Sequence, residues 1–215
     1  MGEGEVAPGF SPADLLRPQV ILLDWSSGPY QQEGSTAQTV QFRRKNIRLP
    51  RHCYVGQQWY FLTACTLGRA ARFRNAGLVE EHLPLLGERA RAEEFAIQAY
   101  CFMPEHLHLL VSGNDATSDC LAFVNGFKQR SGFTFKQRTG QQLWQQKSYD
   151  HILRPGERWQ AVAHYVWMNP VRKGICKQPQ EWPFSGSQTV DWRRLMSSVE
   201  EVWIPPWKIS RRADL

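Results

Sequence analysis

Residues 104–111, Pro-Glu-His-Leu-His-Leu-Leu-Val, carry the pattern that most constrains the fold. In a β-strand, residues two apart point to the same face. His106 and His108 would therefore aim their imidazoles to one side, while Leu107, Leu109 and Val111 would point to the other. The stretch predicts a strand over residues 106–112 that presents two histidines side by side on a sheet.

The segments around this strand predict an alternation of strands and helices. Aromatic and β-branched residues predict one strand over 58–66 and another over 95–103, which Pro104 ends. Helices are predicted over residues 75–94, with Asn75 as the N-cap, from Thr117 or Ser118 to 136, and over 157–168. Residues 143–153 have a weaker extended pattern. This order predicts an α+β fold, an antiparallel sheet with helices on one side.

Length and composition exclude several classes of protein. The chain has 215 residues, which suits one domain with extensions. Its five cysteines form no CxxC pair, which argues against a disulfide scaffold and a cysteine zinc site. The longest apolar run near the start is Val20–Leu23, too short for a signal peptide or a membrane span. We therefore expect a reduced, cytoplasmic protein that does not enter a membrane.

Charge divides the chain into unequal parts. Residues 1–42 hold one arginine and five acidic residues, a net charge of −4. Because the whole chain has a net charge of +6, residues 43–215 must carry a net charge of +10. The first part, rich in Gly, Pro, Ser and Gln, is predicted to be a flexible N-terminal extension. Residues 43–192 are predicted to be the folded domain, and residues 193–215 a basic C-terminal tail. The basic excess favours a nucleic-acid partner, with a well-solvated surface as the alternative.

A second motif lies at Tyr165 and Asn169, which are four residues apart on the last predicted helix. That spacing places both side chains on one helix face. If this helix packs over the histidine strand, Asn169 could be a third metal ligand and Tyr165 would sit beside the metal. A divalent cation could then help the phenol attack a phosphate. The alternatives are two histidines with structural hydrogen bonds, a tyrosine that only packs, and an asparagine that ends the helix before Pro170.

Together the two motifs resemble a known family. Residues 104–108, Pro-Glu-His-Leu-His, followed by residues 165–171, Tyr-Val-Trp-Met-Asn-Pro-Val, resemble the REP-associated tyrosine transposases of the HUH superfamily. The resemblance covers roughly residues 43–190 and includes the segments 143–145, 149–152 and 182–185. Residues 1–42 and the chain beyond about Trp192 have no counterpart in this family.

This resemblance implies a ferredoxin-like (RRM-like) domain with a central antiparallel sheet and helices packed on it. It implies a divalent metal, Mg²⁺ or Mn²⁺, held by His106, His108 and Asn169. Tyr165 would nick single-stranded DNA, leaving a 5′-phosphotyrosine link and a free 3′-hydroxyl that can later rejoin strands. The implied substrates are hairpins of repeated extragenic palindromes with an adjacent single-stranded guide. The implied protein is monomeric, bacterial, cytoplasmic and nucleoid-associated.

Other residues leave alternatives open. Tyr149 is a rival nucleophile beside Asp150 and His151, but the residue four further on is Leu153, which cannot bind metal, so Tyr165 is preferred. His151 either contacts DNA or makes a structural hydrogen bond. Glu105 is predicted to lie on the strand face opposite His106, in a structural role. The predicted DNA contacts are Arg43, Arg44, Lys45, Lys128, Arg130, His151, Arg172 and Lys173.

Two other functions compete with strand nicking and transfer. The first is a catalytically silent protein that binds DNA or RNA hairpins, although binding alone would not need the set of His106, His108, Tyr165 and Asn169. The second is a metal-dependent hydrolase with water as the nucleophile, which would leave Tyr165 unexplained. A covalent protein–DNA adduct separates the first function from both of these.

Overall fold

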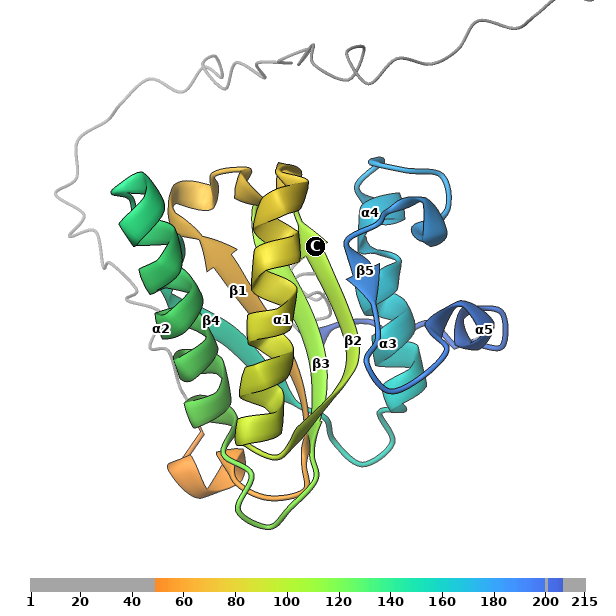
Figure 1. The fold of residues 1–215 in the computed structure, drawn as a ribbon. Coiled ribbons are helices and arrows are strands. Elements are labelled where there is room, and N and C mark those ends of the chain that lie inside the picture. The colour runs from red at the N-terminus through yellow and green to blue at the C-terminus, as the bar shows by residue number, and fades with distance from the viewer. Residues whose placement is uncertain (1–48, 200, 207–215) are drawn as a thin grey trace, which may run out of the picture. The chain divides into compact units, whose positions relative to one another are not determined.

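A computed structural model of the protein describes residues 49–199 and 201–206. The predicted extension 1–42 and the predicted DNA contacts Arg43, Arg44 and Lys45 lie outside the described residues. The chain order, shown in Figure 1, is β1 (Trp59–Thr66), α1 (Ala76–Ala92), β2 (Phe95–Met103), β3 (His106–Gly113), α2 (Cys120–Thr139), β4 (Trp144–Ile152), α3 (Trp159–Trp167), α4 (Asn169–Arg172), β5 (Ser185–Gly186) and α5 (Trp192–Met196). Within the described ranges, no helix combines the length and the apolar character needed to cross a membrane.

The strands form one antiparallel sheet in the order β4-β1-β3-β2-β5. The first four strands with α1 and α2 follow the order βαββαβ, which confirms the predicted ferredoxin-like α+β fold. The first four strands begin and end within a residue or two of their predicted bounds, and the weakly extended stretch 143–153 is β4, at one edge of the sheet. The short strand β5 at the other edge was not predicted. The histidine strand β3 lies at the centre, between β1 and β2.

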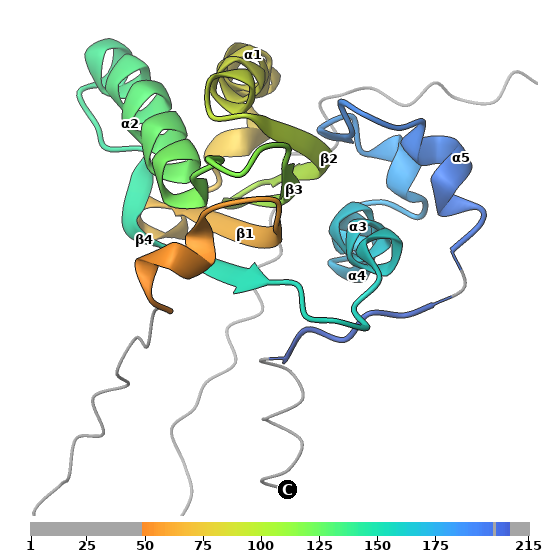
Figure 2. The same ribbon diagram turned by 90° about the horizontal axis from the view of Figure 1, so that it is seen from below.

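Helices cover both faces of the sheet, so the prediction of helices on one side only is wrong. One core contains Tyr60 and Leu62 of β1 together with buried residues of α1 and α2. The other contains Phe61 of β1 and Leu110 of β3 together with residues of α3. Figure 2 shows α1 and α2 on one side of the sheet and α3 on the other. A central strand that is buried on both faces, as β3 is, needs other elements packed on both faces. The alternation of histidine and leucine in its first residues suggested a polar, uncovered face instead.

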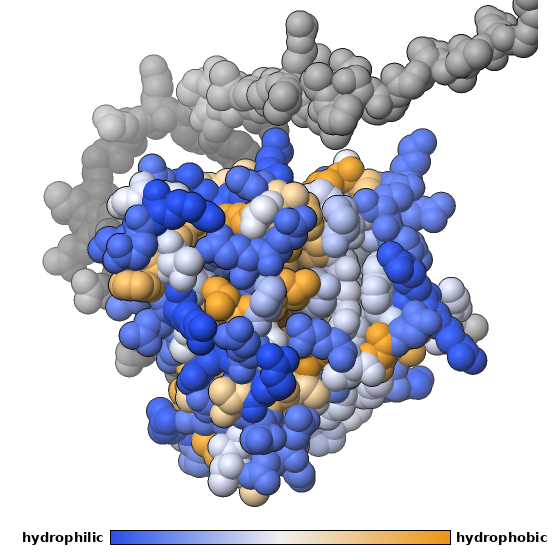
Figure 3. All heavy atoms as spheres, in the orientation of Figure 1, coloured by the Kyte–Doolittle hydropathy of each residue, from blue (hydrophilic) through white to orange (hydrophobic). Residues whose placement is uncertain are grey.

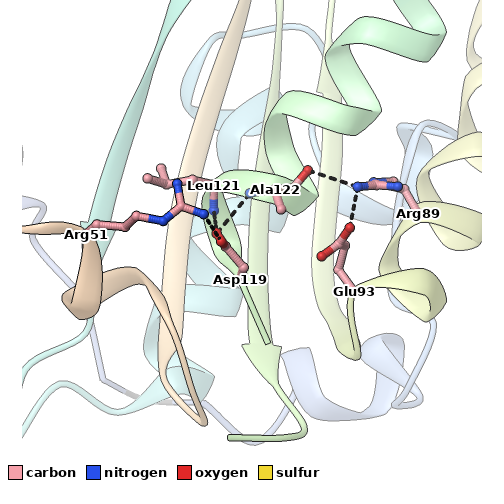
Figure 4. A network of polar contacts seen from close by, with 6 residues as sticks. All are labelled: Arg51, Arg89, Glu93, Asp119, Leu121 and Ala122. Atoms are coloured by element: carbon pink, nitrogen blue, oxygen red, sulfur yellow. Dashed lines mark hydrogen bonds and ion pairs between the residues drawn. The ribbon is translucent and has the colours of Figure 1, made fainter. Parts of the chain in front are cut away.

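Side-chain caps fix where the two long helices begin. Asn75 caps α1 as predicted, and its side chain accepts a hydrogen bond from the Leu78 amide. Helix α2 begins later than predicted, because Asp119 caps it, with its carboxylate 2.9 Å from the Leu121 nitrogen and 3.0 Å from the Ala122 nitrogen. The same carboxylate lies 2.5 Å from the Arg51 guanidinium, and Arg89 of α1 bonds to Glu93 and to the Ala122 carbonyl (Figure 4). The start of α2 is thus tied to two other parts of the chain.

The outward side of the α1–α2 layer is mainly hydrophilic, with smaller apolar areas between the polar ones (Figure 3). Two ion pairs join the helices there, Arg138 with Glu81 at 2.6 Å and Arg130 with Glu88 at 3.2 Å. Exposed pairs of this kind contribute little stability. The apolar contacts beneath them therefore hold this layer on the sheet.

The cap of α2 predicts a difference between two linked variants. Asp119→Ala should lower the free energy of unfolding by about 1 kcal/mol, because two amides at the start of α2 lose their acceptor. Arg51→Gln should cost less than about 0.5 kcal/mol, because the ion pair that it removes is exposed. Urea unfolding followed by circular dichroism measures both, and equal losses would contradict the capping role.

Candidate active site

The register of the sheet aligns three side chains in a row across its α3 face. His108 of β3 pairs with Thr63 of β1, and Thr63 pairs with Tyr149 of β4. Directly paired residues of antiparallel strands point to the same face. In the neighbouring row His106 pairs with Cys65. The predicted alignment of the two histidines is therefore present, and β1 and β4 extend it toward the edge of the sheet.

The two imidazoles lie close together and each has its own polar support. Their Nε2 atoms are 2.9 Å apart. The Nδ1 atom of His106 lies 3.1 Å from a carboxylate oxygen of Glu105, and that of His108 lies 2.9 Å from the Thr63 hydroxyl. Burial is the main cause that lowers the pKa of both histidines, and for His108 the neighbouring His106 lowers it further. Both rings are thus held in the neutral form, with Nε2 directed toward the other ring.

This arrangement fits two ligands of a divalent cation. Metal-bound histidines must be neutral, and their second nitrogen commonly bonds to a carboxylate or another oxygen, as Glu105 and Thr63 provide here. Two ligands about 2.1 Å from an octahedral ion, at right angles, are about 3.0 Å apart. The 2.9 Å between the Nε2 atoms matches that spacing, and it also suits one proton shared between the rings.

Tyr165 of α3 lies beside the histidines. Its ring centroid is 6.4 Å from that of His108 and 5.9 Å from that of Phe61, and the Phe61 ring packs against both. The Arg172 guanidinium lies 3.8 Å from the centroid of the Tyr165 ring and donates a hydrogen bond to the Tyr165 carbonyl at 2.7 Å. Burial raises the pKa of Tyr165, while the positive charge of Arg172 opposes that rise. The tyrosine is therefore packed on one side and faces a cation on another.

Asn169 is buried at the first residue of α4, one turn beyond Tyr165. Its side-chain nitrogen donates to the carbonyls of Tyr165 at 3.1 Å and Val166 at 3.2 Å. The sequence offered the alternative that Asn169 ends the helix. Helix α3 does end nearby, at Trp167, but Asn169 begins the short helix α4, which continues through Pro170. In the described part of the chain, no group of three or more His, Cys, Asp or Glu could hold a metal. Among the described residues, the side chain considered as a third ligand beside the histidine pair is therefore an amide, that of Asn169.

The C-terminal segment contributes a tryptophan to this site. Trp203 is buried, with its ring 5.1 Å from that of Tyr165 and 5.4 Å from that of Phe61. Its indole nitrogen donates to Glu157 at 2.7 Å, and the other oxygen of Glu157 lies 2.8 Å from His151. The structural hydrogen bond that the sequence offered as the alternative for His151 is thus present. The boundary predicted at residue 192 falls at the start of α5, and of the described residues beyond it Leu195, Met196 and Trp203 pack against the α3 core.

Several cations face the histidine pair. The positive charges of Arg69, Arg172 and Lys173 all help to lower the pKa of His108. Lys128 lies elsewhere, at the edge strand, where it donates to the Gln146 carbonyl and the Ser148 hydroxyl. Arg130 is paired with Glu88 on the α1–α2 layer, on the other side of the sheet. Of the described basic residues predicted to bind DNA, Arg172 and Lys173 are therefore near the candidate site.

Three residues of the site were missed by the sequence prediction or placed differently. Glu105 precedes β3 in a turn, so strand alternation does not apply to it, and its carboxylate reaches His106 instead of the opposite face. Thr63 could have been found only from the register of β1 against β3. Arg69 lies in a short 3-10 turn after β1 with a φ of 53°, and no local pattern points to it.

Comparison with known proteins places the motifs in context. The family model described as "Transposase IS200 like" matches residues 54–169, which include His106, His108, Tyr165 and Asn169. The chain is 24% identical over 151 residues to a REP-associated tyrosine transposase of Escherichia coli K12, a match that covers 66% of this chain and 88% of that protein. It is 24% identical over 102 residues to a putative REP-associated tyrosine transposase of Haemophilus influenzae, which covers 42% and 58%.

A solved structure has the same fold. It is described as a REP-associated tyrosine transposase bound to a REP hairpin, and it aligns with a TM-score of 0.59 and 21% identity. The match covers 74% of this chain and 96% of that one.

The docking of the C-terminal segment can be tested with neighbouring variants. Trp203→Ala should lower the free energy of unfolding by about 3 kcal/mol, because it removes a buried indole from the rings of Phe61 and Tyr165. Ile204→Ala, an exposed apolar residue next in sequence, should have little effect. Urea titration measures both, and similar losses in the two variants would refute the docking.

Proposed function

The chain belongs to the IS200-like transposase family, DNA transposases of the HUH tyrosine type, and on this premise we propose that it nicks and rejoins single-stranded DNA through Tyr165. The observation that carries the proposal is the juxtaposition of two buried histidines, whose Nε2 atoms are 2.9 Å apart, with a tyrosine ring 6.4 Å from one of them. The three residues come from one chain, so a monomer can carry out the reaction.

In the proposed reaction, the Tyr165 hydroxyl oxygen attacks a phosphodiester phosphorus. A bond forms between that oxygen and phosphorus, and the bond to the 3′-oxygen breaks. The phenol proton passes to water, and the departing 3′-oxygen takes up a proton as a free hydroxyl. The product is a 5′-phosphotyrosine link, and attack by a 3′-hydroxyl on that link reverses the exchange. One phosphodiester replaces another at each step, so no nucleotide cofactor is required.

The surroundings of Tyr165 suit this task. The rings of Phe61 and Trp203 fix the orientation of the phenol, which lowers the entropic cost of attack. The Arg172 guanidinium favours the phenolate and can also contact the phosphate. With Arg69 and Lys173 it places positive charge close to His108, which favours the approach of a phosphate.

We propose that His106, His108 and the Asn169 side-chain oxygen hold a divalent ion, Mg²⁺ or Mn²⁺. The Asn169 nitrogen donates to two backbone carbonyls, which leaves the oxygen as the ligand atom. Such an ion, when bound, polarises a non-bridging phosphate oxygen. Glu105 and Thr63 orient the two imidazoles through their Nδ1 atoms.

The proposed substrate is single-stranded DNA that folds into hairpins, of the repeated extragenic palindrome type. Support comes from the relatives named for REP elements and from the solved structure with the same fold, which is bound to a REP hairpin. The alternative of a silent hairpin-binding protein leaves the support of both Nδ1 atoms and the burial of Tyr165 without a purpose. The alternative of a hydrolase that uses water would likewise leave Tyr165 without a role.

A covalent trap tests the nucleophile. We expect the protein with Mn²⁺ and a hairpin oligonucleotide from the repeats of its own genome to form an adduct that survives denaturing electrophoresis. Tyr165→Phe should abolish the adduct, because it removes only the attacking oxygen and keeps the ring that packs on Phe61 and Trp203. Tyr149→Phe should retain it.

Mass spectrometry of the digested adduct identifies the linked residue. An adduct lost in Tyr149→Phe and kept in Tyr165→Phe would transfer the nucleophile to Tyr149. Tight hairpin binding with no adduct under any divalent metal would favour the silent binding protein.

A metal titration without DNA tests the ligands independently of activity. The Mn²⁺ affinity, measured by electron paramagnetic resonance, should be lost in His106→Ala and His108→Ala. Glu105→Gln should weaken it about tenfold, because the His106 Nδ1 loses its charged acceptor. Glu80→Gln, an exposed acid of α1, is the matched control and should bind Mn²⁺ normally. Unchanged affinity in both histidine variants would refute the site.

A further inference from the structure

Arg69 has a backbone conformation that an arginine rarely adopts. Its φ is 53° and that of Gly68 is 62°, so two consecutive residues lie in the left-handed region directly after β1. Glycine enters this region freely, whereas the Cβ atom of any other residue is crowded there. The other described non-glycine residue with a positive φ, Glu94, follows the end of α1, where such a residue commonly closes a helix. Arg69 follows a strand instead, and an outlier of this kind points to a role for its side chain.

The turn that carries Arg69 is fixed to the residues that support the histidine pair. The Thr66 amide donates to the Glu105 carbonyl at 3.0 Å, and the Thr66 hydroxyl donates to the Ala70 carbonyl at 2.7 Å. Arg69 lies between these two anchored residues. Glu105 directly precedes His106, and its carboxylate lies 3.1 Å from the His106 Nδ1 atom. The backbone of Arg69 is therefore held in place relative to the first histidine.

The charge of Arg69 reaches both imidazoles. It is among the cations that lower the pKa of His106 and of His108. In the described part of the chain, its side chain is exposed and takes part in no ion pair. Arg172, by contrast, is engaged with the ring and the carbonyl of Tyr165. Of these two arginines, Arg69 is the one that can bind a phosphate without giving up a partner.

We propose that Arg69 is a phosphate clamp, whose guanidinium donates two hydrogen bonds to one backbone phosphate of the DNA bound at the histidine pair. A guanidinium matches the geometry of phosphate oxygens with two parallel donors. The inference rests on the proposed function for the identity of the ligand. It replaces a general attraction by positive charge near His108 with one directed contact, which fixes where the strand lies.

Arg74 offers a matched comparison in the same loop. It is exposed, ends the 3-10 turn Arg72–Arg74 and precedes the helix cap Asn75. Among the described residues it too takes part in no ion pair, but its φ is not positive. Replacing either arginine by glutamine removes the same charge. A diffuse electrostatic attraction would depend on both residues, whereas a clamp depends on Arg69.

A scan with neutral phosphates tests the clamp without chemistry. Hairpin oligonucleotides carry a methylphosphonate at one linkage at a time, along the single-stranded flank and the adjoining stem. They are bound to the full-length Tyr165→Phe protein at about 0.15 M salt, where exposed charges more than about 8 Å apart are largely screened. Fluorescence anisotropy measures the affinity, and the linkage that responds shows whether the phosphate belongs to the flank or to the stem.

The scan has a distinct expected result for each variant. Arg69→Gln should weaken binding of the unmodified hairpin about tenfold, the loss of one charge-assisted pair. It should also abolish the effect of the methylphosphonate at one linkage or two adjacent linkages, because the two changes remove the same contact. Arg74→Gln should weaken binding less than twofold and keep the effect of every methylphosphonate.

Replacement by glycine separates a binding role from a structural one. Arg69→Gly removes the side chain and relieves the left-handed conformation, so the midpoint of urea unfolding should be unchanged or higher. The DNA affinity should nevertheless fall as it does in Arg69→Gln. Arg69→Lys should recover part of the affinity, because it keeps the charge but lacks the planar pair of donors. A lower midpoint with unchanged affinity in Arg69→Gly would assign a structural role and overturn the clamp.

The outcomes separate this inference from the proposed function. A methylphosphonate pattern that is unchanged in Arg69→Gln, or equal losses of affinity in Arg69→Gln and Arg74→Gln, would overturn the clamp. An adduct that depends on Tyr165 would still support nicking in that case. A response confined to one site and dependent on Arg69, in a protein that forms no adduct with any metal, would support the clamp and refute the nicking activity.

Discussion

One buried phenyl ring, that of Phe61, holds the parts of the candidate site together. Its centroid lies within 5.3 to 6.4 Å of those of His108, Trp203, Tyr165 and Tyr149, which come from four different elements or segments. Phe61 itself belongs to β1 and is fully buried. Because a close-packed interior transmits small displacements, a change in this ring would move the metal ligands and the nucleophile together. The relative placement of these groups is therefore a packing property as much as a property of the individual residues.

The backbone pairing of β1 with β3 gives that ring its place. A shift of one residue in this register would turn Thr63 and Phe61 to the other face, leave His108 without its hydroxyl partner and remove Phe61 from the α3 core. Apolar residues on both faces of β1 and β3 oppose such a shift, because it would exchange the contents of the two cores. The support of the histidines and the hydrophobic packing thus favour the same alignment.

Local sequence patterns were sufficient to predict features that depend on neighbouring residues, such as strand alternation and helix caps. The alternation of residues 106–111 predicted the shared face of the histidines, and Asn75 marked the start of α1. The second helical layer could not be predicted, because Ala99, Cys101 and Leu110 are apolar residues whose cover comes from distant α3. Trp203 was missed for the same reason, since it meets Phe61 and Tyr165 from a remote part of the chain with no periodic pattern around it. Roles in binding and catalysis for the predicted residues remain predictions of the sequence that the geometry supports.

The junction between α3 and α4 has a consequence for the orientation of Asn169. Pro170 has no amide hydrogen, so the Val166 carbonyl, four residues earlier, receives no backbone donor from it. The Asn169 side-chain nitrogen donates to that carbonyl instead, at 3.2 Å. The absence of an amide hydrogen on Pro170 thus favours the orientation in which the Asn169 side-chain nitrogen faces the helix and its oxygen faces away. Replacing Pro170 would restore a rival backbone donor to the Val166 carbonyl and leave the Asn169 amide held by the Tyr165 carbonyl, so the residue after Asn169 contributes to its orientation.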